Sequence, residues 1–217
     1  MNARLVLFDM DGVLVDTPSS WVTVHRHFGV DNGENAKLFF EGRIDQMEFM
    51  RSDIRLWMEK KPDLCLDDIK AILGGVGLMK GASRTVAELK RQGVRTAIVS
   101  GGIDLLAQQV AEMTGIDYQV ANGLEADGTG RLTGEGILRV DIRDKSKCAA
   151  EIMKSEGVAR EECLAVGDGP TDISMFRMAG KCIAFNPWNR SIEEAADYVI
   201  REKDLSAILS FVKGGRR

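Results

Sequence analysis

Four aspartates of this chain follow two short apolar segments, and their side chains are well suited to chemistry. Asp9 and Asp11 come directly after residues 4–8 (RLVLF), and Asp168 and Asp172 follow residues 162–166 (ECLAV). Short apolar segments that end at turn residues are typical of buried strands. Because clustered carboxylates repel each other, they need a cation, and hard oxygen ligands favour Mg²⁺. The pattern therefore predicts a Mg²⁺ site at the ends of these strands.

A hydroxyl, two glycines and a lysine occupy comparable positions. Ser100, Gly101 and Gly102 follow another apolar segment, and Lys145 precedes a helical pattern. A lysine and a metal ion together form a positive patch that suits a phosphate group. The Ser100 hydroxyl and the N–H groups of Gly101 and Gly102 could hold phosphate oxygens at a helix N-terminus. Lys147 is the alternative to Lys145 in this role.

The spacing of Asp9 and Asp11 indicates a shared task. Residues two apart on an extended strand point their side chains the same way. One carboxylate could attack phosphorus while the other handles the proton of the leaving group. We therefore expect phosphoryl chemistry at this strand end.

Strand patterns alternate with helical patterns along most of the chain. Strands are expected at residues 4–8, 94–100, 118–121, 162–166, 181–185 and 196–200, a hairpin over 124–140 around Asp127–Gly128, and helices over 83–93, 102–115, 144–157 and 171–180. This alternation predicts an α/β fold, a Rossmann-like parallel sheet flanked by helices with right-handed crossovers. Ligands of such sheets bind beyond the C-terminal ends of the strands, where the residues above lie.

Helical patterns without β-branched runs fill the segment from about residue 17 to 77. We expect a small helical cap at residues 16–79, inserted into an α/β core of residues 1–15 and 80–217. The insertion leaves the first strand at its C-terminal end, so it is placed to cover the site. Gly74, Gly75 and Gly77 mark a hinge between cap and core.

Composition narrows the class of protein. The 217 residues carry a net charge of −4 and are 44% apolar, and no apolar run approaches the length of a membrane helix. We expect a cytoplasmic protein with a small-molecule partner and neither nucleic acid nor membrane. The four cysteines show no metal-ligand spacing and are interpreted as buried thiols. Oligomeric state is not indicated by any motif, and residues 214–217 are expected to form a frayed tail.

The motifs taken together resemble the haloacid dehalogenase superfamily of phosphatases and phosphotransferases. The segments that carry the resemblance are FDMDGVL (8–14), VSGG (99–102), Lys145 and VGDGPTDISMF (166–176). Within the superfamily the chain is most similar to phosphoserine phosphatases, through VSGGID (99–104), YQVAN (118–122) and GDGPTDISMFRMAG (167–180). The resemblance spans the whole predicted core.

The resemblance implies a two-step reaction. Asp9 would form an aspartyl-phosphate, while Asp11 protonates the departing alcohol and then activates water. Mg²⁺ would be bound by Asp9, the backbone carbonyl of Asp11 and Asp168, with Asp172 supporting. An acid two residues after the nucleophile is a feature of the phosphatases in this superfamily and is missing from its dehalogenases. Its presence here favours a phosphomonoester substrate.

The resemblance also implies which residues bind phosphate. These are Ser100, Gly101 and Lys145, and Lys145 would also neutralise Asp9. The phosphoryl group would then transfer in a charge-compensated pocket that holds little water, where such contacts are strongest.

Three positions depart from the phosphoserine phosphatase pattern. Pro18 stands near the glutamate that reads the substrate ammonium, and Asp53 near the arginine that reads its carboxylate. The usual asparagine of the last motif is Thr171, a possible substrate-reading residue. Arg51 and Arg55 flank Asp53 and could substitute for the missing arginine; the alternative is that both are surface charges.

Several functions stay open on these residues. FDMDGVLVDT (8–17) also resembles the first motif of β-phosphoglucomutases and phosphoglycolate phosphatases, so sugar phosphates and phosphoglycolate are candidate substrates. A phosphotransferase or mutase would use Asp11 in the same way. A phospho-accepting receiver domain would lack the insertion and the GDG loop, and a non-catalytic phosphate-binding module would not need every catalytic position filled.

Overall fold

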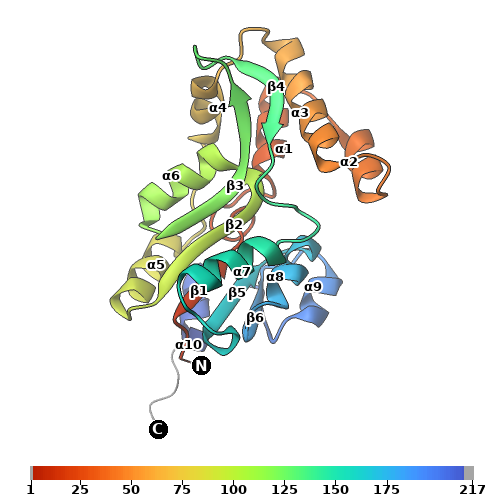
Figure 1. Ribbon diagram of the computed structural model, residues 1–217. Coiled ribbons are helices and arrows are strands. Elements are labelled where there is room, and N and C mark those ends of the chain that lie inside the picture. The colour runs from red at the N-terminus through yellow and green to blue at the C-terminus, as the bar shows by residue number, and fades with distance from the viewer. Residues whose placement is uncertain (1, 213–217) are drawn as a thin grey trace.

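The computed structural model describes residues 2–212, so the expected tail at residues 214–217 lies outside it. A seven-stranded sheet forms its centre, in the order β4-β3-β2-β1-β5-β6-β7, and every neighbouring pair is parallel except β3 and β4 (Figure 1). The strands are β1 (Leu5–Phe8), β2 (Arg95–Ile103), β3 (Tyr118–Ala126), β4 (Leu132–Ile137), β5 (Cys163–Gly167), β6 (Lys181–Phe185) and β7 (Tyr198–Ile200). The predicted α/β class is confirmed.

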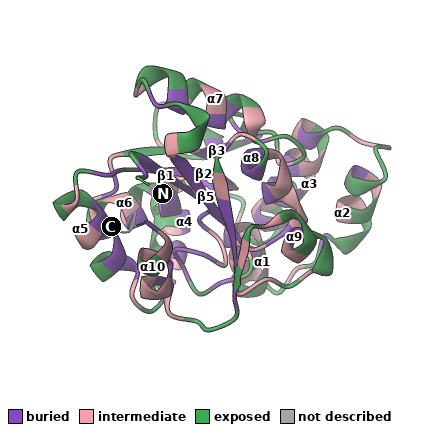
Figure 2. Cartoon of the chain, turned by 90° about the horizontal axis from the view of Figure 1, so that it is seen from below, coloured by how far each residue is buried: buried purple, intermediate pink, exposed green. Residues whose placement is uncertain are grey.

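Helices cover both faces of the sheet, because its central strands are apolar on both sides. In β1, Val6 and Phe8 pack into one cluster and Leu5 and Leu7 into another, and all four are fully buried. The first cluster includes side chains of α5 (Ala82–Arg91), α6 (Asp104–Thr114) and α10 (Leu209–Val212); the second includes those of α7 (Ser146–Ser155), α8 (Ile173–Phe176) and α9 (Arg190–Ala195). Figure 2 shows the buried strands between these exposed helical surfaces.

Four helices form the inserted segment, which we define as residues 16–79: α1 (Ser20–Phe28), α2 (Gly33–Phe40), α3 (Gln46–Lys60) and α4 (Leu66–Leu73). They lie beyond the C-terminal end of β1 (Figure 1). The two connections to the core run side by side, since Asp16 N–H donates to Gly77 O at 3.1 Å and Met79 N–H donates to Leu14 O at 2.8 Å. The domain boundaries themselves stay a prediction.

The predicted hairpin is formed by β3 and β4, with Asp127 N–H donating to Arg131 O at 2.8 Å at the turn. β3 is longer than expected, because its first half pairs with β2 and its second half with β4. The hairpin reaches past the sheet to the insertion (Figure 1), where Leu66 N–H donates to Gly130 O and Leu132 N–H to Leu64 O. It thus joins the core to the inserted helices at a point that the sequence did not indicate.

Two helix starts differ from the expectation. β2 continues to Ile103, so α6 begins at Asp104 rather than near residue 102. The helix expected over residues 171–180 is a 3-10 turn at Pro170–Asp172 followed by the short α8. Within residues 2–212, no helix combines the length and apolar character needed to cross a membrane.

Candidate active site

A cavity of about 360 Å³ lies where the C-terminal ends of β1, β2 and β5 meet the insertion. Eight residues predicted for the site line it: Asp9, Asp11, Ser100, Gly101, Gly102, Lys145, Asp168 and Thr171. Asp172, also predicted, is fully buried behind them. The strand ends thus bring together residues that are far apart in the sequence.

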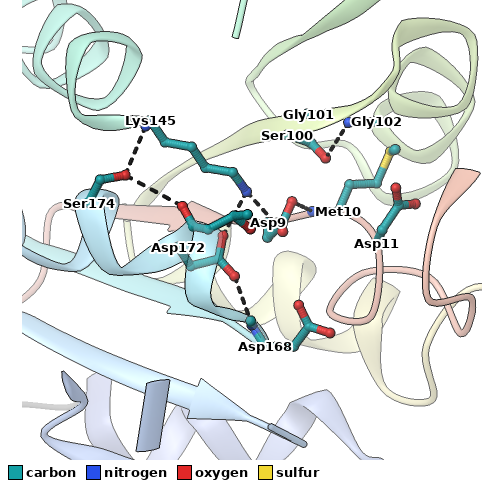
Figure 3. A network of polar contacts seen from close by, with 12 residues as sticks. Asp9, Met10, Asp11, Ser100, Gly101, Gly102, Lys145, Asp168, Asp172 and Ser174 are labelled. Carbon is teal, nitrogen blue, oxygen red and sulfur yellow. Dashed lines mark hydrogen bonds and ion pairs between the residues drawn. The ribbon is translucent and has the colours of Figure 1, made fainter. Parts of the chain in front are cut away.

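Lys145 connects two of the aspartates (Figure 3). Its Nζ lies 2.9 Å from Asp9 Oδ2 and 2.6 Å from Asp172 Oδ1, and the side chain is almost fully buried. Burial alone would lower the pKa of Lys145, but the charges of Asp172 and Asp9 outweigh it and raise that pKa above its ordinary value. Lys145 is therefore a cation in the site, whereas the alternative, Lys147, is exposed.

Asp172 anchors the loop after β5. Its Oδ2 accepts the N–H groups of Asp168 at 3.0 Å and Gly169 at 3.1 Å, while its Oδ1 faces Lys145. Both oxygens are thereby occupied, and burial raises the pKa of Asp172. This geometry fits a supporting residue that positions Asp168 and Lys145.

A divalent cation fits the remaining carboxylates. Asp9, Asp168 and Asp172 each offer an oxygen within 4.8 Å of the others, and no described residue donates a hydrogen bond to the Asp168 carboxylate. Burial and the charges of Asp9 and Asp172 raise the pKa of Asp168 to about 8. Gly12, with φ of +76°, leaves room for this carboxylate, since a Cβ there would collide with it. The donor set is all oxygen and carries excess negative charge, as a hard cation requires.

Asp11 lies apart from that group and contacts the insertion instead. Its Oδ2 accepts both the N–H and the hydroxyl of Ser20, each at 2.9 Å, and the Ser20 Oγ accepts Ile103 N–H at 2.9 Å. The other oxygen, Oδ1, is buried without a partner. Burial raises the pKa of Asp11 to about 7, against the lowering effect of the Ser20 hydrogen bonds. An unpartnered buried oxygen of this kind can exchange a proton with a ligand.

Asp9 is held in a fixed orientation beside Lys145. Its Oδ1 accepts the N–H of Met10 at 2.7 Å, and its side chain is 9% exposed. Both contacts leave the carboxylate at the wall of the cavity.

Ser100 is buried at the end of β2, and its Oγ accepts Gly102 N–H at 3.1 Å (Figure 3). The Gly102 N–H is thus engaged by Ser100 and, because β2 continues past the glycines, it does not lie at a helix N-terminus; its contact with phosphate stays a prediction. Gly102 is needed for another reason. A Cβ there would lie 2.6 Å from Ser20 Oγ and 2.7 Å from Asp11 Oδ2, so glycine lets the insertion approach the strand.

Two side chains hold the backbone at Gly101. Trp21 of α1 donates its Nε1–H to Gly101 O at 3.1 Å, and the fully buried Asn122 of β3 donates to the same oxygen at 3.2 Å. The carbonyl of the predicted phosphate-binding loop is thus fixed from both the insertion and the core.

The structure does not bring Arg51 and Arg55 to the cavity. Arg51 Nε lies 2.5 Å from Glu135 Oε2 on the hairpin, and Arg55 lines shallow depressions on the outside of α3. Gln46, Met50 and Asp53 line the cavity instead, as their spacing on one helix face requires. The interpretation of the two arginines as surface charges is the one that their placement favours.

Sequence reasoning missed three residues of the site. Ser20 is the second residue of a serine pair that signals a helix start, but its contact with Asp11 leaves no local pattern. His25 lines the cavity, and so does Trp188 from the loop after β6. Trp188 follows the last motif by one strand, but no sequence signal shows that its side chain lines the cavity.

Comparison with known proteins identifies the family to which the chain belongs. Residues 6–177 match the haloacid dehalogenase-like hydrolase family. The chain is 35% identical over 213 residues to a phosphoserine phosphatase of Methanocaldococcus jannaschii, covering 97% of this chain and 98% of that one. It is 32% identical to a phosphoserine phosphatase of Archaeoglobus fulgidus, covering 97% of this chain and 60% of that longer one.

A solved structure agrees with these relatives. A phosphoserine phosphatase described as a phospho-aspartyl intermediate analogue superposes with a TM-score of 0.82 and 33% identity, covering 98% of this chain and all of that one. The resemblance drawn from the motifs is confirmed, and the chain belongs to the haloacid dehalogenase-like hydrolase family.

Proposed function

We propose that this hydrolase cleaves small phosphomonoesters through an aspartyl-phosphate on Asp9. The observation that carries the proposal is that two groups suited to phosphoryl transfer lie in the same cavity as Asp9. Lys145 supplies a buried cation on one side, and Asp11, which lines the same cavity, has a buried oxygen without a partner. The similar structure described as a phospho-aspartyl intermediate analogue supports the same chemistry.

In the first step, an oxygen of Asp9 attacks phosphorus and the bond from phosphorus to the alcohol oxygen breaks. Asp11 donates its proton to that oxygen, so the alcohol leaves uncharged. Because its pKa is raised to about 7, Asp11 retains a substantial protonated fraction near neutral pH. Ser100 and Lys145 bind the phosphate oxygens throughout, where buried charge-assisted contacts are strong.

In the second step, water attacks the phosphorus of the aspartyl-phosphate and gives a proton to Asp11. The bond between phosphorus and the Asp9 oxygen breaks, which releases inorganic phosphate and restores the carboxylate. Lys145 stays between Asp9 and Asp172 and stabilises the returning charge.

The cation of the site is proposed to be Mg²⁺. Asp9, Asp168 and the backbone carbonyl of Asp11 would hold it, with Asp172 positioning Asp168. When bound, Mg²⁺ supplies a Lewis acid that balances the charge of the phosphate oxygens. The oxygen donors and the excess of carboxylates over lysine fit this assignment.

The inserted segment is proposed to act as a cap that excludes water from the reaction. We place the enzyme in the cytoplasm, since its four cysteines are all free thiols. Its proposed partner is a small phosphomonoester, and neither nucleic acid nor membrane takes part.

Phosphate release from p-nitrophenyl phosphate, with Mg²⁺ and with a chelator, tests this function. The Asp9→Asn variant should lose all measurable turnover, and the chelator should have the same effect on the unmodified protein. Asp63→Asn makes the same chemical change at an exposed position of the insertion and serves as the control. Mass spectrometry of the quenched enzyme should find phosphate on Asp9; full activity of Asp9→Asn would overturn the assignment.

A further inference from the structure

The cavity wall formed by the insertion carries carboxylates and no lysine or arginine among the described residues. Among the described residues that line the cavity, Lys145 is the only lysine or arginine, and Asp9 and Asp172 already surround its charge. The insertion contributes two carboxylates, Asp31 and Asp53, to the same cavity. A substrate whose phosphate lies beside Lys145 and the proposed Mg²⁺ therefore meets negative charge at its other end.

Asp53 is the carboxylate that carries this inference, because its burial is nearly complete. Its side chain is 3% exposed, and its Oδ1 accepts His25 Nε2–H at 2.8 Å and Asn32 Nδ2–H at 2.6 Å. No described residue donates a hydrogen bond to Oδ2 in this structure. One oxygen is thus fixed by neighbours and the other is left for a ligand.

The neighbouring histidine does not neutralise Asp53. Trp57 donates its Nε1–H to His25 Nδ1 at 2.8 Å, so that nitrogen holds no proton and the proton of the ring is on Nε2. Trp57 is fully buried and stacks on Trp21, with ring centroids 5.4 Å apart, which fixes the donor in place. His25 is therefore neutral, and Asp53 is a buried carboxylate without a cation. Such a charge is costly unless a partner balances it.

Aromatic side chains also line the cavity. Trp21, Phe40 and Phe49 come from the insertion, as Asp53 does, whereas Trp188 lies beside Gly169 of the core; Phe40 and Trp188 remain 63% and 67% exposed. Aromatic faces attract cations, most strongly where water is excluded. They offer nothing to a carboxylate, for which Asp31 and Asp53 are repulsive.

We infer that the alcohol part of the substrate carries a cationic nitrogen and no carboxylate. The substrate class is a phosphorylated amino alcohol, with the phosphate beside Lys145 and the ammonium group beside Asp53 and the aromatic side chains. This inference rests on the proposed phosphomonoester hydrolysis and adds to it the identity of the other end of the substrate.

A matched set of substrates tests the charge preference. Phosphate release is compared for phosphoethanolamine and phosphocholine (cation only), O-phosphoserine (cation and carboxylate), phosphoglycolate (carboxylate only) and glycerol phosphate (neither). We expect kcat/KM for the cationic pair to exceed that for phosphoglycolate by about 10- to 100-fold, the range of one charge-assisted contact. Comparison of phosphoethanolamine with phosphocholine shows whether the site prefers a primary or a quaternary ammonium group. Equal values across the set, or a preference for carboxylates, would overturn the inference.

The Asp53→Asn variant tests whether Asp53 causes the preference for cationic substrates. It should lose the advantage of cationic substrates while still hydrolysing glycerol phosphate, and Asp63→Asn should keep that advantage. An unchanged preference in folded Asp53→Asn, verified by its melting temperature, would show that another residue reads the ammonium group and would refute the role of Asp53.

Inhibition of the unmodified enzyme gives a test that does not depend on how a variant folds. Aminoethylphosphonate, propylphosphonate and phosphonoacetate differ only in the charge at the far end, and they compete with p-nitrophenyl phosphate. The inhibition constant should be lowest for aminoethylphosphonate and highest for phosphonoacetate. If p-nitrophenyl phosphate is hydrolysed but the order is reversed, this inference alone fails; if no ester is hydrolysed, the proposed function fails with it.

Discussion

At the scale of single residues, the two oxygens of Asp11 have different surroundings. Oδ2 accepts two hydrogen bonds from Ser20, whereas Oδ1 is buried without a partner. The first oxygen fixes the carboxyl group, and the second is the one that can exchange a proton with substrate or water. Ser20 is thus a positioning residue for the proposed general acid, although it belongs to the insertion.

Replacing Ser20 with alanine should separate positioning from folding. The variant loses the hydroxyl that donates to Asp11 and accepts Ile103 N–H, so Asp11 is held by one hydrogen bond fewer. We expect kcat to fall by up to about 10²-fold, as for a misplaced catalytic group, with KM nearly unchanged. Because Ile103 N–H loses its partner, the free energy of unfolding should drop by about 1–3 kcal/mol.

Steady-state kinetics and urea unfolding of Ser20→Ala provide both numbers. Ser155→Ala removes an exposed hydroxyl at the end of α7 and is the control for the substitution itself. A loss confined to stability, with kcat unchanged, would mean that Ser20 supports the fold and does not orient Asp11.

Residue types alone were enough to predict part of this site. Asp9 and Asp168 could be predicted because strand ends in a parallel sheet converge, whatever the rest of the chain does, and Lys145 from its place at the start of a helical pattern. Asp53 was identified only as a departure from a pattern. Its exposure to the cavity depends on how α3 packs, and the same packing turns Arg51 toward Glu135. Contacts of this kind depend on tertiary structure and leave no local signal.

At the scale of elements, α1 is the helix that connects the insertion to the core strands. Its Trp21 donates to Gly101 O, next to Ser100 at the end of β2. The sequence predicted the helices and strands themselves, since their apolar periodicity is local. It did not predict that β2 continues through the glycines, because the pairing of Ile103 with Asn122 on β3 extends it.

The Trp21→Phe variant tests this connection. Phenylalanine keeps an aromatic ring against Trp57 but cannot donate to Gly101, so the insertion is held against the core less firmly. One lost hydrogen bond is worth about 0.5–1.5 kcal/mol, which corresponds to a KM raised by roughly 2- to 10-fold if substrate binds only when the insertion is closed.

Steady-state kinetics of Trp21→Phe, compared with those of one variant in the core, test whether this hydrogen bond holds the insertion closed. Tyr198→Phe removes the hydroxyl that accepts a hydrogen bond from Lys181, far from the cavity, and should leave KM as it is. A Trp21→Phe enzyme with unchanged KM and kcat would show that this hydrogen bond does not contribute to closure.

At the scale of the whole molecule, the core gathers four carboxylates around one lysine, and the insertion adds Asp31 and Asp53 to the same cavity. The excess of negative charge opposes folding of the metal-free protein. It also makes the cavity attractive to cations, a metal ion at the phosphate end and an ammonium group at the other. Binding of Mg²⁺ should therefore stabilise the fold, and protons should compete with Mg²⁺ for the carboxylates.

The direction of this competition follows from Asp168, whose pKa is raised from 3.8 to about 8 in the metal-free fold. A carboxyl with a raised pKa binds more protons folded than unfolded, so it makes the metal-free protein less stable as pH rises from about 4 to 8. The proposed Mg²⁺ would bind the deprotonated form and remove that penalty. The rise in melting temperature on adding MgCl₂ should thus be larger at pH 7.5 than at pH 5.5, with metal affinity up to about 100-fold weaker at the lower pH for one displaced proton.

Asp168→Asn should abolish most of the rise in melting temperature, and Asp63→Asn should preserve it. An equal rise at both pH values would mean that the cation binds without displacing the proton of Asp168, and Asp168 would then not be its ligand.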